Sequence, residues 1–354
     1  MGTKLQAASV FTKTLGAALA RVITSRFKGD RAHPVYFKDV IFASMRTALG
    51  NSTIEADKAG IQQSTEQAYH AVVKQFGFEP NSVELNDGAK AHWMGNKRAS
   101  KTLVYLHGGA YIMPANTSQL TWVHELMTTM NEGHKPGSDV SVVILEYYTT
   151  PAHRYPVQLQ QAIALLRYLL ETESRDPSSL FLLGDSAGGN LCLALLSHIS
   201  HPHHSLPKLS VPSPLGGACL ISPWVSFNTE EDAYYRNASS DAFDGRALGR
   251  WSHAFLGSPA NSDYYSEPAT APPSWWEGFE NIVSEVLIWA GGAEVLIDGI
   301  RAFAKRFKAG YKGGLSIVET PRAAHEEMII DTMLGYKKKG VYQLEVENWV
   351  KAKL

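Results

Sequence analysis

Residues 180–191 constrain the fold of this chain more than any other segment. An apolar, strand-like run there meets the pattern Gly-x-Ser-x-Gly around Ser186, and a helix-like run to His198 follows. A strand that turns sharply into a helix needs small residues beside the turn. The turn exposes the serine hydroxyl at the carboxyl end of the strand, next to the partial positive charge of the helix N-terminus. The motif alone is weak evidence, and the strand–turn–helix context makes it informative.

From residue 82 onward, strand-like segments alternate with helix-like segments, which indicates βαβ units and a mostly parallel sheet. The expected strands cover 83–85, 91–93, 101–106, 140–145, 180–183, 217–222, 283–290 and 315–319. The expected helices cover 117–130, 157–170, 191–198, 296–307 and 343–353.

Two regions depart from this alternation. Residues 1–80 look helical, and residues 225–281 are rich in loops and aromatic side chains. We therefore predict N-terminal cap helices over 1–80, the first part of an α/β core over 81–224, a cap insertion over 225–281, and the second part of the core over 282–354.

Composition excludes several classes of protein. With 354 residues, 44% of them hydrophobic, and a formal net charge of -1, the chain is typical of a globular enzyme and not of a nucleic-acid binder. Its two cysteines, Cys192 and Cys219, lie in apolar segments and are expected to be buried free thiols. No apolar run approaches the about 20 residues of a membrane span, and we see no secretory signal. We expect a cytoplasmic protein without stable membrane insertion.

Apolar residues recur at near-helical spacing between Leu5 and Ile23. We interpret this segment as a packed cap helix, with a membrane-surface helix as the alternative. We find no metal cluster or cofactor fingerprint, so we expect no metal and no cofactor. The expected partner is a small-molecule ester, and a homodimer remains open.

A serine hydroxyl needs a base to take its proton, and the base needs an acid to orient it. His325 follows the last expected strand, so it is our candidate base, ahead of His201, His203 and His204, which we expect at the surface of a polar loop. Two acids follow the strand at 283–290. We favour Glu294, directly after the strand, over Asp298, which falls inside the next helix.

The glycine-rich turn after the strand at 101–106 is the expected source of donors for a developing oxyanion. Its sequence runs from His107 through Gly108, Gly109 and Ala110 to Tyr111. We expect Gly109 and Ala110 to donate backbone N–H groups, together with Ala187 after the serine, and Gly108 to shape the turn. For substrate binding, the candidates are Tyr111, Asp185 and Trp224.

These motifs together resemble the hormone-sensitive-lipase-like group of α/β-hydrolases. The matching stretches are 107–111, 184–191, 146–156 and 292–298. The resemblance covers about residues 80–354 and implies eight mostly parallel strands with a helical cap, and it implies Glu294 as the acid. The segment 275–279 is similar to fungal members associated with small-molecule metabolism.

The chain also departs from the pattern of this group. The third oxyanion glycine is Ala110, the acid Asp is Glu294, two threonines replace the common Leu-Ala at 149–150, and Glu326 follows the histidine in place of a frequent glycine. None of these changes removes a catalytic group.

The sequence thus predicts a serine hydrolase that cleaves an acetyl ester, lactone or thioester of an apolar small molecule. One alternative is an acyltransferase that passes the acyl group to an alcohol or amine. The other is a non-catalytic ligand-binding relative.

Overall fold

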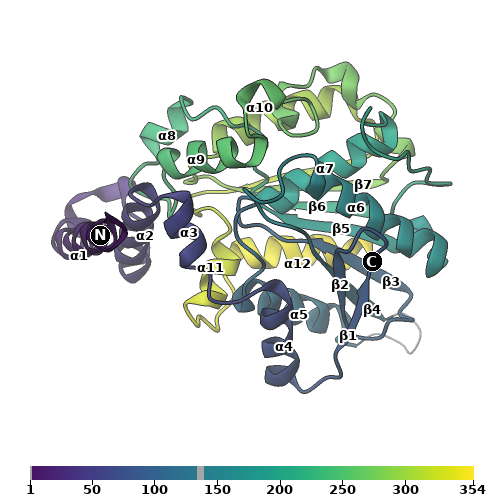
Figure 1. The fold of residues 1–354 in the computed structure, drawn as a ribbon, viewed down its shortest axis with the longest axis horizontal. Helices are drawn as coiled ribbons and strands as arrows, with labels where there is room; N and C mark the ends of the chain where they lie inside the picture. Colours follow the sequence, from purple (N-terminus) through teal and green to yellow (C-terminus); the bar gives the residue numbers. More distant parts are fainter. Residues whose placement is uncertain (1, 134–138) are drawn as a thin grey trace.

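The computed structural model describes residues 2–133 and 139–354. An eight-stranded sheet with strand order β1-β2-β4-β3-β5-β6-β7-β8 forms its centre (Figure 1). Strands β1 and β2 pair antiparallel, as do β2 and β4, and all other neighbours are parallel. The predicted α/β class and mostly parallel sheet are confirmed. The strands are β1 Asn81–Glu84, β2 Lys90–Met94, β3 Lys101–Leu106, β4 Val140–Glu146, β5 Leu180–Asp185, β6 Gly217–Ile221, β7 Glu285–Gly291 and β8 Gly314–Thr320.

Helices cover both faces of the sheet. Their bounds are α1 Gly2–Thr24, α2 Tyr36–Gly50, α3 Ile54–Ala59, α4 Thr65–Phe76, α5 Thr117–Asn131, α6 Val157–Arg167, α7 Ala187–Ser200, α8 Asp232–Arg236, α9 Gly245–Leu256, α10 Ile297–Gly310, α11 Glu327–Met333 and α12 Val341–Lys353. The sequence predicted most core helices to within a few residues of their bounds. It did not predict α11, the short helix after His325.

The sheet has an apolar core on each face because successive side chains of a strand point to opposite sides. On β3, Leu103 and Tyr105 join a core with α4, α5 and α12, whereas Val104 and Leu106 join a core with α6, α7 and α10. Both cysteines are buried and free, as predicted.

Helices α1, α2 and α3 lie together at one end of the molecule, near α8 and α9 (Figure 1). Two carboxylates link these elements. Asp39 on α2 binds Arg21 of α1 at 2.5 Å, and Asp57 on α3 binds Arg250 of α9 at 3.0 Å. The carboxylate of Asp57 also accepts the indole N–H of Trp251 at 2.8 Å. These contacts join α1 to α2 and α3 to α9.

The prediction of a packed cap helix at the N-terminus is wrong for most of its apolar side chains. Helix α1 contacts α2, yet Phe11 is 70% exposed and Ile23 is 69% exposed. The buried contacts of α1 are made instead by its polar Arg21. Within the described residues, no helix combines the length and the apolar character needed to cross a bilayer.

Candidate active site

Ser186 lies at the turn between β5 and α7, in a backbone conformation with φ 50° and ψ -116°. The turn is held by the main chain: the Ser186 N–H donates to the Ile221 carbonyl, and its carbonyl accepts the N–H of Trp224, each at 2.9 Å. Glycine at 188 is required by close approach, since a Cβ there would lie 1.8 Å from the Leu106 carbonyl oxygen. A non-glycine residue with positive φ costs about 1–3 kcal/mol, and such residues concentrate at functional sites.

His325 and Glu294 meet at the ends of β8 and β7. The Nδ1 atom of His325 lies 2.5 Å from Oε2 of Glu294. The other carboxylate oxygen of Glu294 accepts the Gly291 N–H at 2.8 Å and the Ser222 hydroxyl at 3.1 Å. Both side chains are buried. Donors on neighbouring strand ends therefore fix the carboxylate that faces the imidazole.

Asp298, the alternative acid, points elsewhere. Its carboxylate binds Arg236 of α8 at 2.7 Å and Arg301 of its own helix at 3.1 Å, and it accepts the Ala233 N–H at 2.9 Å. These contacts join α10 to α8 and do not involve His325. Of the two acids that follow β7, only Glu294 forms a hydrogen bond with His325 in the described structure.

Asp241 is a buried acid that the sequence reading missed. It accepts the Val295 N–H at 2.7 Å and lies 3.3 Å from the backbone nitrogen of His325, so it holds the two loops that carry Glu294 and His325 together. Burial raises its pKa to about 6, with Glu294 adding to the effect and His325 opposing it. Nothing in the local pattern of residues 225–281 singles it out, because its partners come from loops more than fifty residues away.

The glycine-rich turn after β3 lies beside Ser186. Gly109 and Ala110 line the same cavity as Ser186, and both have positive φ, 110° and 53°. Gly108 packs behind them, where a Cβ would lie 2.3 Å from the Asp185 carboxylate. Ala187 is the first residue of α7, so its N–H is among the helix-terminal donors without an intrahelical partner. The turn and the helix N-terminus thus lie on two sides of the serine.

Glu326 adds a second carboxyl group next to the imidazole. Its Oε1 atom lies 3.5 Å from Nε2 of His325, and its backbone is left-handed, with φ 51° and ψ 38°. Burial raises its pKa well above the usual range, and the neighbouring Asp185 raises it further, while His325 opposes the shift. The sequence reading noted Glu326 only as a replacement of a glycine, because its contact with the histidine depends on this backbone conformation.

A cavity of about 220 Å³ lies in front of Ser186, His325 and Glu326. Its wall is mainly apolar and comes from α2, α9, α11 and the loop after β7. The apolar side chains on this wall are Met45, Leu49, Met113, Phe243, Leu248, Trp251, Val295, Leu296, Ile329, Ile330 and Met333. Phe243 packs edge-on against the His325 ring, with 4.9 Å between ring centroids.

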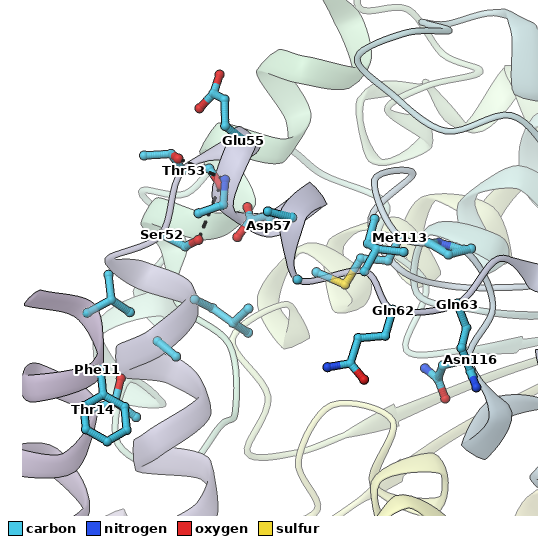
Figure 2. A pocket seen from close by; sticks show the side chains of 18 of the residues that line it. Phe11, Thr14, Ser52, Thr53, Glu55, Asp57, Gln62, Gln63, Met113 and Asn116 are labelled. Atoms are coloured by element: carbon cyan, nitrogen blue, oxygen red, sulfur yellow. Dashed lines mark hydrogen bonds between the residues drawn. The ribbon is translucent and has the colours of Figure 1, made fainter. Parts of the chain in front are cut away.

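A larger cavity of about 1050 Å³ lies next to it, between α1, α2, α3 and the loop before α5 (Figure 2). The two cavities have Leu49, Met113, Pro114 and Asn116 in common. The space in front of Ser186 is therefore the narrow inner part of a wider opening toward the N-terminal helices.

The residues expected to bind substrate lie behind the site. Asp185 accepts hydrogen bonds from Tyr105 and Gln119, Tyr111 donates to Asn190 at 2.6 Å, and Trp224 is fully buried. None of Tyr111, Asp185 and Trp224 lies on the wall of either cavity. Their surroundings fit a supporting role for the turn and the strand ends, and the cavity presents other side chains to a ligand.

The loop histidines expected at the surface are not all exposed. His203 is only 5% exposed and packs edge-on against the rings of Tyr155 and Tyr265. Its loop folds back onto the cap residues, which the polar composition of the segment did not indicate.

Comparison with known proteins gives consistent results. A family profile described as alpha/beta hydrolase fold matches residues 103–329. An acetyl-hydrolase of Streptomyces hygroscopicus is 28% identical over 258 residues, which is 70% of this chain and 76% of that protein. Steryl acetyl hydrolase 1 of Saccharomyces cerevisiae is 23% identical over 225 residues, or 60% of this chain and 49% of that protein.

Solved structures agree on the fold. A crystal structure described as an esterase from the bacterial hormone-sensitive lipase family superposes with a TM-score of 0.61 at 20% identity and covers 85% of this chain and 95% of that one. The predicted α/β-hydrolase fold is thus confirmed by the family profile, and the superposition shows that the chain shares its fold with an esterase of the hormone-sensitive lipase group.

Proposed function

Because this chain belongs to the alpha/beta hydrolase fold family, we propose that it hydrolyses carboxylic esters through an acyl-enzyme formed on Ser186. One observation carries the proposal: the imidazole of His325 is hydrogen-bonded to the buried Glu294 on one side and lines the cavity of Ser186 on the other. This is the arrangement that a serine needs in order to become a nucleophile.

In the first half-reaction, the Ser186 oxygen attacks the ester carbonyl carbon and its proton passes to Nε2 of His325. Glu294 accepts the Nδ1 proton in a hydrogen bond and stabilises the imidazolium. When the tetrahedral intermediate collapses, the bond to the alcohol oxygen breaks, and the alcohol leaves with the proton from His325. A water molecule then repeats the sequence on the acyl-enzyme, releasing the acid and restoring the serine.

We assign stabilisation of the oxyanion to the backbone N–H groups of Gly109, Ala110 and Ala187, with Gly108 allowing the turn to pack against Asp185. Preorganised donors of this kind typically contribute about 10²–10³ in rate. No step of this reaction requires a metal or a cofactor. That the protein uses neither remains a prediction from the sequence.

We further propose a substrate with a short acyl group and a bulky apolar alcohol. The inner cavity of about 220 Å³ suits a small group beside Ser186, whereas the adjoining cavity of about 1050 Å³ matches the upper range of small-molecule sites. The relatives that are named acetyl-hydrolases support a short acyl group. Within the predicted set of acetyl ester, lactone and thioester, an acetyl ester is favoured.

The first test removes the nucleophile. Ser186→Ala should lower kcat/KM for a short-chain p-nitrophenyl ester by about 10⁴-fold or more, because attack on the carbonyl is lost. A fluorophosphonate probe should add one adduct to the wild type at Ser186 and none to Ser186→Ala. The exposed Ser178→Ala serves as the control and should keep both activity and labelling. Undiminished hydrolysis by Ser186→Ala would contradict the proposal.

A second test addresses the substrate. Activity should fall as the acyl chain of a p-nitrophenyl ester lengthens, and it should rise when the acetate of a small alcohol is replaced by the acetate of a large apolar alcohol. Product analysis with an added alcohol separates hydrolysis from acyl transfer. The cytoplasmic location, the possible homodimer and a role in fungal small-molecule metabolism remain predictions from the sequence.

A further inference from the structure

Exposed apolar side chains concentrate on one part of the molecule. Of the eighteen large apolar residues that are exposed in the described structure, half lie between residues 11 and 37. They are Phe11, Leu15, Leu19, Val22, Ile23, Phe27, Val35, Tyr36 and Phe37. We call this set the N-terminal apolar surface. Single exposed apolar residues are ordinary, whereas a contiguous set of this kind marks an interaction site.

Specific contacts hold α1 in the orientation that exposes this surface. Phe11, Leu15 and Leu19 follow one another at intervals of four residues, so they share one face of the helix. The contacts on the other side of the helix are specific: Arg21 binds Asp39 of α2 and donates to the Ser239 carbonyl at 2.7 Å. Within the surface itself, the Tyr36 hydroxyl donates to the Val22 carbonyl at 2.7 Å and holds the segment after α1 against the helix. The contacts of Arg21 leave Leu15 and Leu19 exposed, while Phe11 lies at the edge of the large cavity.

The same segment is strongly basic. Residues 2–37 contain six Lys and Arg residues and one acid, Asp30, which gives a formal charge of +5 in a chain whose net charge is -1. The exposed members include Lys13, Arg26 and Arg31. The pKa of Lys28 is lowered mainly by burial, and the nearby charges of Arg21 and Arg46 lower it further while Asp39 opposes the shift. An anionic lipid surface attracts such segments by about 1 kcal/mol per basic residue.

This surface is continuous with the large cavity. Val10, Phe11 and Thr14 of α1 line the cavity that adjoins the space in front of Ser186, and Figure 2 shows Phe11 and Thr14 on α1 with Met113 across the same cavity. Apolar molecules dissolved in a bilayer would meet this opening if α1 lay on the lipid.

We propose that the N-terminal apolar surface binds an anionic lipid surface and that apolar esters enter the large cavity from it. The chain lies on the bilayer and does not span it, with the apolar face of α1 at the boundary between head groups and acyl chains. The lipid binding stands by itself, whereas the entry route rests on the proposed ester hydrolase function. A second copy of the chain is disfavoured as the occupant, because a symmetric contact would bring two surfaces of the same charge together.

The test measures sedimentation with vesicles of phosphatidylcholine alone and of phosphatidylcholine mixed with phosphatidylserine. The wild type should sediment with the anionic vesicles, bind less as salt increases, and bind weakly to the neutral ones. The double variant Leu19→Glu/Ile23→Glu should bind at least about tenfold more weakly, since both side chains lose their apolar contact with lipid. Tyr235→Glu, at an exposed aromatic on α8, is the matched control and should bind like the wild type.

Hydrolysis gives the second readout. Leu19→Glu/Ile23→Glu should retain activity on a soluble short-chain ester, because neither residue lines a cavity, and should lose activity on an apolar ester held in vesicles. Ser186→Ala should sediment like the wild type, which separates failure of lipid binding from failure of the proposed catalysis. Equal sedimentation of the wild type and the double variant would overturn the proposal. So would a wild-type dimer that the double variant dissociates, since a second copy would then cover the surface.

Discussion

The imidazole of His325 lies between two glutamates whose surroundings differ. Behind the ring, Oε2 of Glu294 accepts a hydrogen bond from Nδ1 of the imidazole. Its Oε1 atom accepts hydrogen bonds from the Ser222 hydroxyl and the Gly291 N–H. In front, at Nε2, the Oε1 atom of Glu326 is buried without a hydrogen-bond partner among the described residues. Donors from strand ends therefore hold the carboxylate behind the ring in place, whereas burial and the neighbouring Asp185 raise the pKa of the carboxyl in front and the charge of His325 opposes that shift.

This difference predicts unequal consequences of removing each charge. Glu294→Gln should cause the larger loss, about 10³–10⁴-fold in kcat, because the amide neither orients the imidazole nor stabilises the imidazolium. Steady-state kinetics on a short-chain ester would measure it. Asp298→Asn is the control, and it should change kcat by less than about threefold, since its contacts are with partly exposed arginines. Comparable losses in both variants would contradict the assignment of the acid.

The variant Glu326→Gln tests the carboxyl group next to Nε2 of His325, and its effect is measured as the pH dependence of kcat/KM. Burial lowers the pKa of His325, but the carboxyl groups of Glu326, Glu294 and Asp241 outweigh burial and raise it. Because the pKa of His325 is raised, its neutral form, which acts as the base, appears only at higher pH. In Glu326→Gln, the amide removes the negative charge that stabilises the imidazolium at Nε2. The acid limb of kcat/KM should therefore move to lower pH, by about 1 unit. An unchanged profile with a lower rate would mean that Glu326 acts only through packing.

The part of the cavity wall that α11 forms should show the smallest effect. Met333 lines the inner cavity and is 47% exposed, so Met333→Ala removes apolar contact with little loss of stability. Loss of about 1 kcal/mol of apolar contact should raise KM for an apolar ester about fivefold and leave kcat unchanged. A fall in kcat with constant KM would show that α11 affects the chemistry rather than binding.

Much of the core was predictable because its signals are local. The strands from β3 to β8 are short apolar runs between turn residues, and the Gly-x-Ser-x-Gly turn gives both the position of Ser186 and the small residues that its close packing requires. His325 was found from its position after the last strand. These inferences depend on residues that are neighbours in the sequence.

The cap was less predictable, because its contacts join distant segments. The apolar spacing of α1 resembles that of a buried helix, and only its contacts with α2 through Arg21 decide that the apolar face points outward. In the same way, the buried position of Asp241 depends on loops that follow β7 and β8.

By itself, the sequence determined the order of strands and helices, the strained turn at the serine and the identity of its candidate partners, since backbone conformation and apolar periodicity are local properties. Tertiary structure alone decided that Glu294 and not Asp298 faces the histidine, that Glu326 lies at Nε2, and which side chains form the cavity. Those outcomes depend on where separate chain segments meet, and no pattern within one segment encodes the direction of a side chain toward another.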